Sequence, residues 1–353
     1  MIAGHEMRYE SIRTLRALAI LSVVLGHLAL VEAKFGQGAT VLPAFLIRGL
    51  GGIDLFFIIS GLMMVITSRG KFHSGKRALS FIYNRLVRIY PLYWIYSFVA
   101  LAAFLIHPAW WVTNAPENWR DLLVSFLLLP SRKLPLLNVA WMLIHLLYFY
   151  GIFSLFLWLL KEERLPAGLT LWALLVLTGQ VYFRFGSSPS PTLDLLLHPY
   201  TLEFIAGCFL GILIHRHRHS RGLICLTGGI ILYGGTVFLL NLFPSQGLIT
   251  GWNRVLHFAL PDALILYGAI VLERQGRLSL PSWFNRLGDA SYSIYLSHVL
   301  VLSAAGSLWT FFPTPASFHR AVVLTAMVGG VILFGWLSFR YVESPLLKKI
   351  REW

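Results

Sequence analysis

The chain has 353 residues, of which 57% are hydrophobic and 12% are charged. Soluble globular domains carry about 25% charged residues, so this composition excludes an ordinary soluble domain and predicts an integral membrane protein. The formal net charge is +14, but the basic residues gather in segments expected to flank membrane helices, which argues against nucleic-acid binding.

Apolar runs of membrane length predict an all-α, polytopic protein with about ten transmembrane helices. They cover residues 12–33, 46–66, 89–107, 139–160, 169–184, 199–215, 222–243, 255–272, 291–312 and 320–341. Residues 121–130 are apolar but too short to cross, and predict an interfacial or re-entrant segment. We expect one membrane domain over residues 1–353 with no appended soluble domain.

Most of the Lys and Arg residues fall in segments that become cytoplasmic if the N-terminus lies inside. This bias predicts that both termini are cytoplasmic. The largest outer segment is then 108–138, in which Trp110, Trp111 and Trp119 suit a membrane-interface belt or a sugar-stacking platform.

The first predicted helix contains His27, eleven residues after Arg16. An ionisable group at membrane depth is costly and is usually retained for chemistry or transport. At 1.5 Å per residue, Arg16 lies about 16 Å away, near the bilayer edge.

The second predicted helix begins outside, so Asp54 shares the outer half of the bundle with His27. Its carboxylate either orients the His27 imidazole or is favoured by the helix dipole alone. Gly51, Gly52 and Gly61 are also typical of tight helix packing.

Arg85 and Arg88 are spaced three residues apart, on one helical face. Guanidinium pairs suit phosphate groups, although a positive-inside flank also explains them. His298 in the ninth span either helps to bind a donor or packs, and Glu203 is a candidate acceptor-site residue.

The sequence does not predict a metal-binding site. Cys208 and Cys225 lie in apolar stretches, so neither a disulfide nor a metal site is expected. The segment 215–219 alternates histidine with arginine, whose charge repels cations, and it predicts a cytoplasmic charged loop.

Six blocks, in this order, resemble the acyltransferase-3 family of integral membrane acyltransferases over nearly the whole chain. They are Arg16 to His27, residues 52–61 with Met64, the RLVRIYP run at 85–91, and residues 141–150, 287–298 and 340–346.

The resemblance implies transfer of an acetyl or other acyl group from cytoplasmic acyl-CoA to a hydroxyl of a polysaccharide or lipid-linked glycan. It implies a ten-helix core in membrane lipid, in a bacterial inner membrane. Acyl-CoA is then the donor substrate, with no permanently bound cofactor.

Carried over residue by residue, the resemblance makes His27 the catalytic base or transient acyl carrier, with Asp54 beside it. Arg16, Arg85 and Arg88 would engage the donor's anionic groups. The donor path would be lined by Ser60, Gly61 and Met64.

The fourth-span motif departs from the family pattern, because Leu146 stands where a glutamate is expected. Leucine cannot accept a proton or a hydrogen bond. His145 is adjacent, but one residue rotates it about 100° around a helix. Tyr150 follows the family pattern and is a further candidate for a place in the acceptor site or directly behind it.

Three interpretations of Leu146 therefore stand: a variant that uses another group, an engineered inactive form, or a natural loss of activity. A transporter or flippase for a lipid-linked glycan is the alternative function, because intramembrane His and Asp also suit proton coupling.

Overall fold

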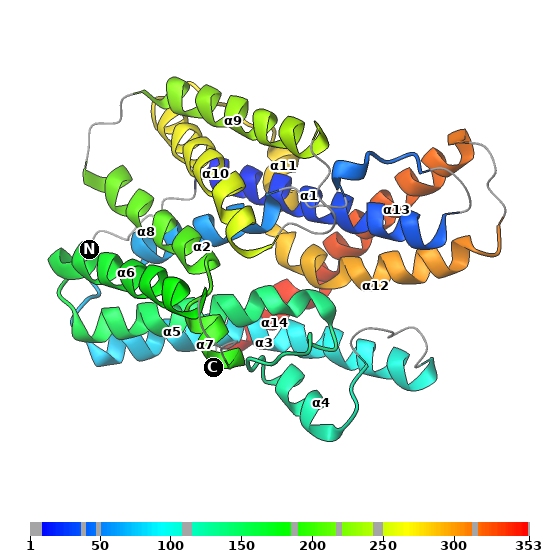
Figure 1. Ribbon diagram of the computed structural model, residues 1–353, viewed down its shortest axis with the longest axis horizontal. Helices are drawn as coiled ribbons and strands as arrows, with labels where there is room; N and C mark the ends of the chain where they lie inside the picture. The colour runs from blue at the N-terminus through cyan, green and yellow to red at the C-terminus, as the bar shows by residue number, and fades with distance from the viewer. Residues whose placement is uncertain are drawn as a thin grey trace.

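The computed structural model describes residues 9–36, 40–46, 51–107, 115–184, 190–216, 221–242, 250–312 and 317–351. Every regular element in these ranges is helical (Figure 1). The predicted all-α class is therefore confirmed for the described chain.

One helix coincides with each of the ten predicted spans. They are α1 (Glu10–Phe35), α2 (Gly52–Thr67), α3 (Gly75–Ile106), α5 (Trp141–Leu159), α6 (Leu165–Arg184), α8 (Tyr200–Arg216), α9 (Gly222–Leu242), α10 (Gly251–Arg274), α12 (Ser291–Trp309) and α13 (Ser317–Ser338). Shorter helices connect them: α4 (Trp119–Phe126), α7 (Pro191–Leu196), α11 (Ser282–Asp289) and α14 (Ser344–Arg351).

Among the described residues, 8 helices are long and apolar enough to cross a membrane. The prediction of ten is therefore confirmed only in part. Helix α2 has 16 residues, or about 24 Å at 1.5 Å per residue, which is less than the hydrocarbon thickness. Helix α12 falls outside the eight because serines and His298 lower its hydropathy. The side on which the termini lie stays a prediction.

Helix α3 begins well before the apolar run that predicted it. The side chain of Ser74 caps its first turn by accepting a hydrogen bond from the Arg77 amide. Residues 75–88, which include Arg85 and Arg88, are therefore a helical extension of the span. Because hydropathy registers only the apolar part, the sequence predicted the helix but not its start.

Glycines set the closest helix contacts. A Cβ built on Gly61 of α2 would lie 2.0 Å from the Phe204 carbonyl oxygen of α8, and one on Gly207 would lie 2.0 Å from that of Ile58. One on Gly52 would lie 2.1 Å from the Ser22 hydroxyl of α1. The packing interpretation of these α2 glycines is confirmed, since any side chain there would push the helices apart.

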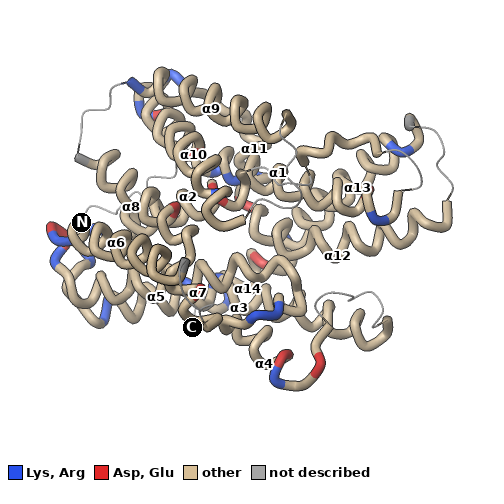
Figure 2. Tube along the Cα trace, viewed as in Figure 1, with Lys and Arg blue, Asp and Glu red and all other residues tan. Residues whose placement is uncertain are grey.

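Charged residues lie mostly at the ends of the helices, as Figure 2 shows. A further group joins the start of α1 to α10 and α11. Arg13 forms an ion pair with Asp289, and the Glu273 carboxylate accepts from the Ser11 amide at 3.0 Å. These contacts fasten the N-terminal end of α1 to elements more than 260 residues later in the chain.

The segment after α3 folds back onto it. Tyr93 donates to the Ser125 carbonyl at 2.6 Å, and the indole of Trp94 donates to the Phe126 carbonyl at 3.0 Å. The predicted short apolar segment is thus the separate helix α4, while its depth in a membrane stays a prediction. Trp119 is exposed, and Trp110 and Trp111 lie outside the described residues.

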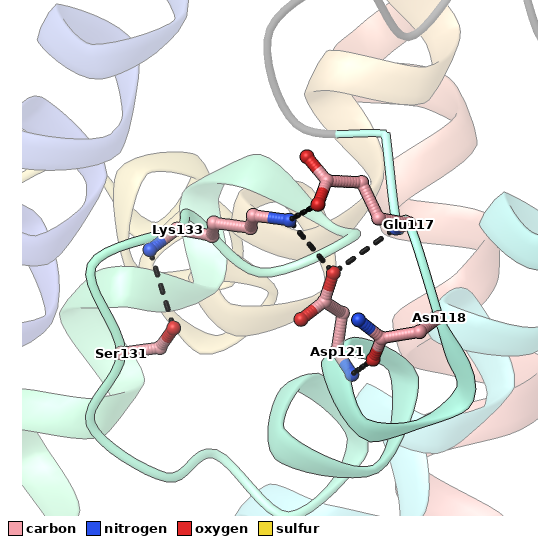
Figure 3. Close-up of polar contacts among 5 residues, drawn as sticks. All are labelled: Glu117, Asn118, Asp121, Ser131 and Lys133. Atoms are coloured by element: carbon pink, nitrogen blue, oxygen red, sulfur yellow. Dashed lines mark hydrogen bonds and ion pairs between the residues drawn. The ribbon is translucent and has the colours of Figure 1, made fainter.

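Ion pairs connect the start of this segment to Lys133 near its end (Figure 3). The Lys133 ammonium lies 2.9 Å from both the Glu117 and the Asp121 carboxylates, and Asn118 caps α4 by accepting from the Asp121 amide. The hydrogen bond from Lys133 holds the pKa of Asp121 below its ordinary value. In turn, Asp121 raises the pKa of Lys133.

Candidate active site

Two histidines from distant parts of the chain face each other inside the bundle. His27 of α1 and His298 of α12 have ring centroids 4.7 Å apart, with an angle of 80° between the ring planes. His298 is completely buried. Helices α1 and α12 pack together, which brings a residue from the start of the chain to one near its end.

Each ring is held by its own helix. The Nδ1 atom of His27 lies 3.0 Å from the Val23 carbonyl oxygen, and that of His298 lies 2.6 Å from the Tyr295 carbonyl oxygen. A carbonyl oxygen only accepts, so Nδ1 carries the hydrogen in both rings. A neutral imidazole has one N–H, and Nε2 therefore holds the basic lone pair of each.

The lone pair on His298 is isolated within the described part of the protein. Its Nε2 atom is buried and has no hydrogen-bond partner there. Tyr295, whose carbonyl orients the His298 ring, donates its own hydroxyl to the Val139 carbonyl just before α5. The pair is thus fixed from α1, α12 and the entry to α5, an arrangement that suits proton transfer from a bound hydroxyl.

The three predicted donor-binding arginines come together. Arg16 of α1 lies within electrostatic range of Arg85 and Arg88 of α3, and of Tyr150 of α5. The Arg85 guanidinium lies 5.6 Å from the Tyr150 ring centroid and donates to the Thr67 hydroxyl at 3.3 Å. Guanidinium groups offer paired donors that suit phosphate oxygens, so the role of these arginines in donor binding stays a prediction.

Tyr150 therefore belongs with the arginines. Its ring also contacts the Phe81 ring edge-on, at 6.4 Å between centroids. Tyr150, a candidate for the acceptor site or a place directly behind it, thus lies near Arg16 and Arg85. Its role stays a prediction.

Asp54 has a different partner from the one we expected. Its Oδ2 atom lies 2.6 Å from Nη2 of Arg254 on α10, whereas His27 contacts Val23 and His298. The prediction that Asp54 orients His27 is therefore wrong in its partner. Asp54 is fully buried in the first turn of α2, where the dipole of the helix N-terminus also favours its charge.

Arg254 has two further carboxyl groups nearby besides that of Asp54. Glu203 of α8 lies within electrostatic range of both Asp54 and Arg254, and so does Asp262 of α10. No N–H or hydroxyl group among the residues that the structure describes donates to either Glu203 oxygen. Arg254 and Asp262 were missed in the sequence, although ionisable residues in an apolar run are themselves a signal of function.

The remaining predicted donor-path residues lie along α2. Met64 is buried in the main apolar core and Ser60 is half-buried. Gly61 lies where α2 crosses α8. Their role in a donor path stays a prediction.

Leu146 is 7% exposed and belongs to the main apolar core. Next to it, His145 turns toward His198 and Tyr200, at 4.7 Å and 5.5 Å between ring centroids. His145 thus contacts a second aromatic cluster and not the His27–His298 pair. The expectation that His145 does not simply replace the missing glutamate stays a prediction.

No group of three or more His, Cys, Asp or Glu side chains in the described ranges is arranged to hold a metal ion. Of the histidine–arginine segment, His217, Arg218 and His219 lie outside those ranges. His215 is described, and its ring contacts the Arg69 guanidinium.

Comparison with known sequences identifies the family. The family model described as "Acyltransferase domain", of the acyltransferase-3 type, matches residues 9–340. The chain belongs to the acyltransferase-3 family. Together with the 8 apolar helices of membrane length in the described ranges, this match makes the protein a multi-pass membrane protein of an acyltransferase family.

Two relatives connect the family to cell-surface glycans. The chain is 30% identical to the exopolysaccharide production protein ExoZ of Rhizobium meliloti (strain 1021), over 86% of this chain and 91% of ExoZ.

The second relative is the peptidoglycan O-acetyltransferase OatA of Listeria monocytogenes serovar 1/2a (strain ATCC BAA-679 / EGD-e). It is 23% identical over 96% of this chain and 56% of OatA, so the chain spans about half the length of that relative. No solved structure matches the chain.

Proposed function

We propose that this protein is a membrane O-acyltransferase that moves an acetyl group from acetyl-CoA to a hydroxyl of a cell-surface polysaccharide or its lipid-linked precursor. Family membership supports acyl transfer, and the two relatives support a glycan acceptor. The observation that carries the proposal is the His27–His298 pair, in which both Nε2 atoms hold a basic lone pair.

In the direct route, Nε2 of His27 removes the proton from the acceptor hydroxyl. The resulting oxygen attacks the thioester carbonyl carbon, and a C–O bond forms as the C–S bond breaks. The proton then passes to the thiolate or to solvent, which leaves an ester and free CoA thiol. General base catalysis of this kind supplies about 10²- to 10⁴-fold in rate.

In the covalent route, Nε2 of His27 attacks the thioester carbonyl and the thiolate leaves. The acceptor hydroxyl then attacks the acyl-imidazole, and His298 takes the hydroxyl proton. Both routes use a deprotonated Nε2 on His27, and only the second requires a base besides His27. We propose His298 as that base, because its ring centroid lies 4.7 Å from that of His27.

In this proposal the arginines bind the donor. Arg16 lies within electrostatic range of Arg85, Arg88 and Tyr150, and CoA is a polyanion whose phosphates suit guanidinium forks. Arg16 and His27 are eleven residues apart on α1, which is about 16 Å along the helix axis. An extended thioester arm between the phosphates and the reacting carbonyl spans this separation.

The test measures free thiol released from acetyl-CoA by purified protein, with and without a glycan acceptor. We expect acceptor-dependent thiol release that is lost in His27→Ala. His257→Ala is the matched control, because the His257 ring in α10 likewise bonds through Nδ1 to the carbonyl four residues earlier, that of Asn253. Equal loss in both variants, or none in either, would refute the role of His27.

The same assay distinguishes an acyltransferase from the alternative function, a glycan transporter. A glycan transporter consumes no thioester, so glycan movement without thiol release would contradict the proposal. Leu146→Glu tests whether the absence of the family glutamate has cost this chain its activity. Activity that appears only in this variant would show that the present chain is catalytically impaired.

A further inference from the structure

A groove separates α8 from α9 on the side of the bundle. Both helices pack on α10, which forms the floor between them, and α8, α9 and α10 lie next to one another in Figure 1. The groove has a volume of about 420 Å³, within the range of small-ligand pockets. Its walls are largely apolar: Leu210, Leu213, Cys225, Leu260, Leu264 and Tyr267.

The groove has one charged end. Arg221 lines it, just before α9. Helix α9 runs antiparallel to α10, because Gly222 faces Val271 whereas Gly229 faces Ile265 and Pro261. Arg221 therefore lies toward the Tyr267 end, and the apolar walls continue toward Leu260. Seven residues of α10 separate those two positions, about 10 Å along the axis.

The positive charge of Arg221 is not used in an ion pair among the described residues. Its side chain is exposed, and no carboxylate among the described residues forms an ion pair with it. The adjacent end of α8 carries His215, which contacts Arg69, so this end of the bundle is basic. A tyrosine hydroxyl and a guanidinium at the same end suit a phosphate group.

The shape and the charge together select an amphipathic anion. Both flanking helices belong to segments apolar enough to cross a membrane, so we expect lipid around the groove. We propose that the groove binds an anionic phospholipid, with one acyl chain along α10 and the phosphate at Arg221. Such a lipid satisfies the apolar walls and the guanidinium at once.

This site is separate from the acyl-donor arginines, which lie on α1 and α3. The proposal does not depend on the acyltransferase activity, and its test needs no turnover. Cys225 supplies a native reporter position in the groove wall, and the other cysteine, Cys208, is completely buried.

The experiment attaches a bimane fluorophore to Cys225 in a Cys208→Ala background and reconstitutes the protein in phosphatidylcholine vesicles. Phosphatidylglycerol or phosphatidylcholine with brominated chains is then added at matched fractions, since bromine quenches bimane on contact. We expect brominated phosphatidylglycerol to reach half-quenching at a fraction at least about threefold lower, as expected for one added charge interaction.

Arg221→Gln should make the two quenching curves coincide. Arg277→Gln is the matched control, because Arg277 is exposed beyond the end of α10 and does not line the groove. Native mass spectrometry of unlabelled protein should show one phosphatidylglycerol fewer retained in Arg221→Gln only. Coincident curves in the parent protein, or equal loss of preference in both arginine variants, would overturn the proposal.

Discussion

The buried ion pair between Asp54 and Arg254 predicts an unequal response to removal of its two partners. The guanidinium and the carboxylate lie 2.6 Å apart, and both are buried. Two further carboxyl groups, those of Glu203 and Asp262, lie within electrostatic range of Arg254. Arg254 is therefore ion-paired with one carboxylate and has two further carboxyl groups nearby.

Arg254→Gln leaves Asp54 with no guanidinium in a buried place. Breaking a buried pair in this way costs about 3–5 kcal/mol, because an uncompensated charge stays in a medium of low dielectric constant. Asp54→Asn keeps the shape and an acceptor oxygen, and the guanidinium still has Glu203 and Asp262 nearby. Its cost should be that of one charged hydrogen bond, about 1.5–3 kcal/mol.

The assay is thermal unfolding of detergent-solubilised protein followed by tryptophan fluorescence, with Arg277→Gln as an exposed control. The melting temperature should fall about twice as far for Arg254→Gln as for Asp54→Asn. The double variant should be more stable than Arg254→Gln alone, since it removes the lone carboxylate. A larger loss for Asp54→Asn, or strictly additive losses, would refute the reasoning.

Three further predictions follow from the contacts above. His298→Gln should reduce acyl transfer by about 10²-fold or more while leaving the melting temperature nearly unchanged if His298 acts as a base; a matched loss of stability would indicate packing instead. Gly61→Ala should lower the stability by about 1–3 kcal/mol through overpacking against α8, and an unchanged melting temperature would contradict the close crossing. Lys133→Gln should lower the melting temperature at neutral pH, because Asp121 loses the contact that depresses its pKa. The stabilisation by this contact is fully present above the pKa of Asp121 in the unfolded chain and is lost as the pH falls through the pKa of Asp121 in the folded protein. The melting temperatures of the parent protein and Lys133→Gln should therefore converge in acid. A difference in melting temperature that does not depend on pH would contradict the role of this contact.

The positions of the helices were predictable because hydropathy over a membrane length is a local signal. Their lengths were less so. Helix α3 gains a basic extension through a Ser74 cap, and α2 has only 16 residues. The Ser74 cap is a short-range contact, which the mean hydropathy of a window does not encode.

Several residues of the candidate site could be named from the sequence, but their pairings could not, and Arg254 and Asp262 were missed. The cost of burying an ionisable group pointed to His27, and residue spacing pointed to Arg85 and Arg88. The partner of His27 is 271 positions away, and that of Asp54 is 200 positions away. Such contacts follow from how α1, α2, α10 and α12 pack, which a single sequence does not reveal.

Labelled acetyl transfer tests the central claim most directly. Purified protein is incubated with acetyl-CoA carrying a labelled acetyl group and a polysaccharide acceptor, and both the label in alkali-labile ester and the free thiol are counted. We predict one thiol per ester in the parent protein and neither product in His27→Ala. Labelled ester formed at the parental rate by His27→Ala, or glycan translocation without any ester, would contradict the account.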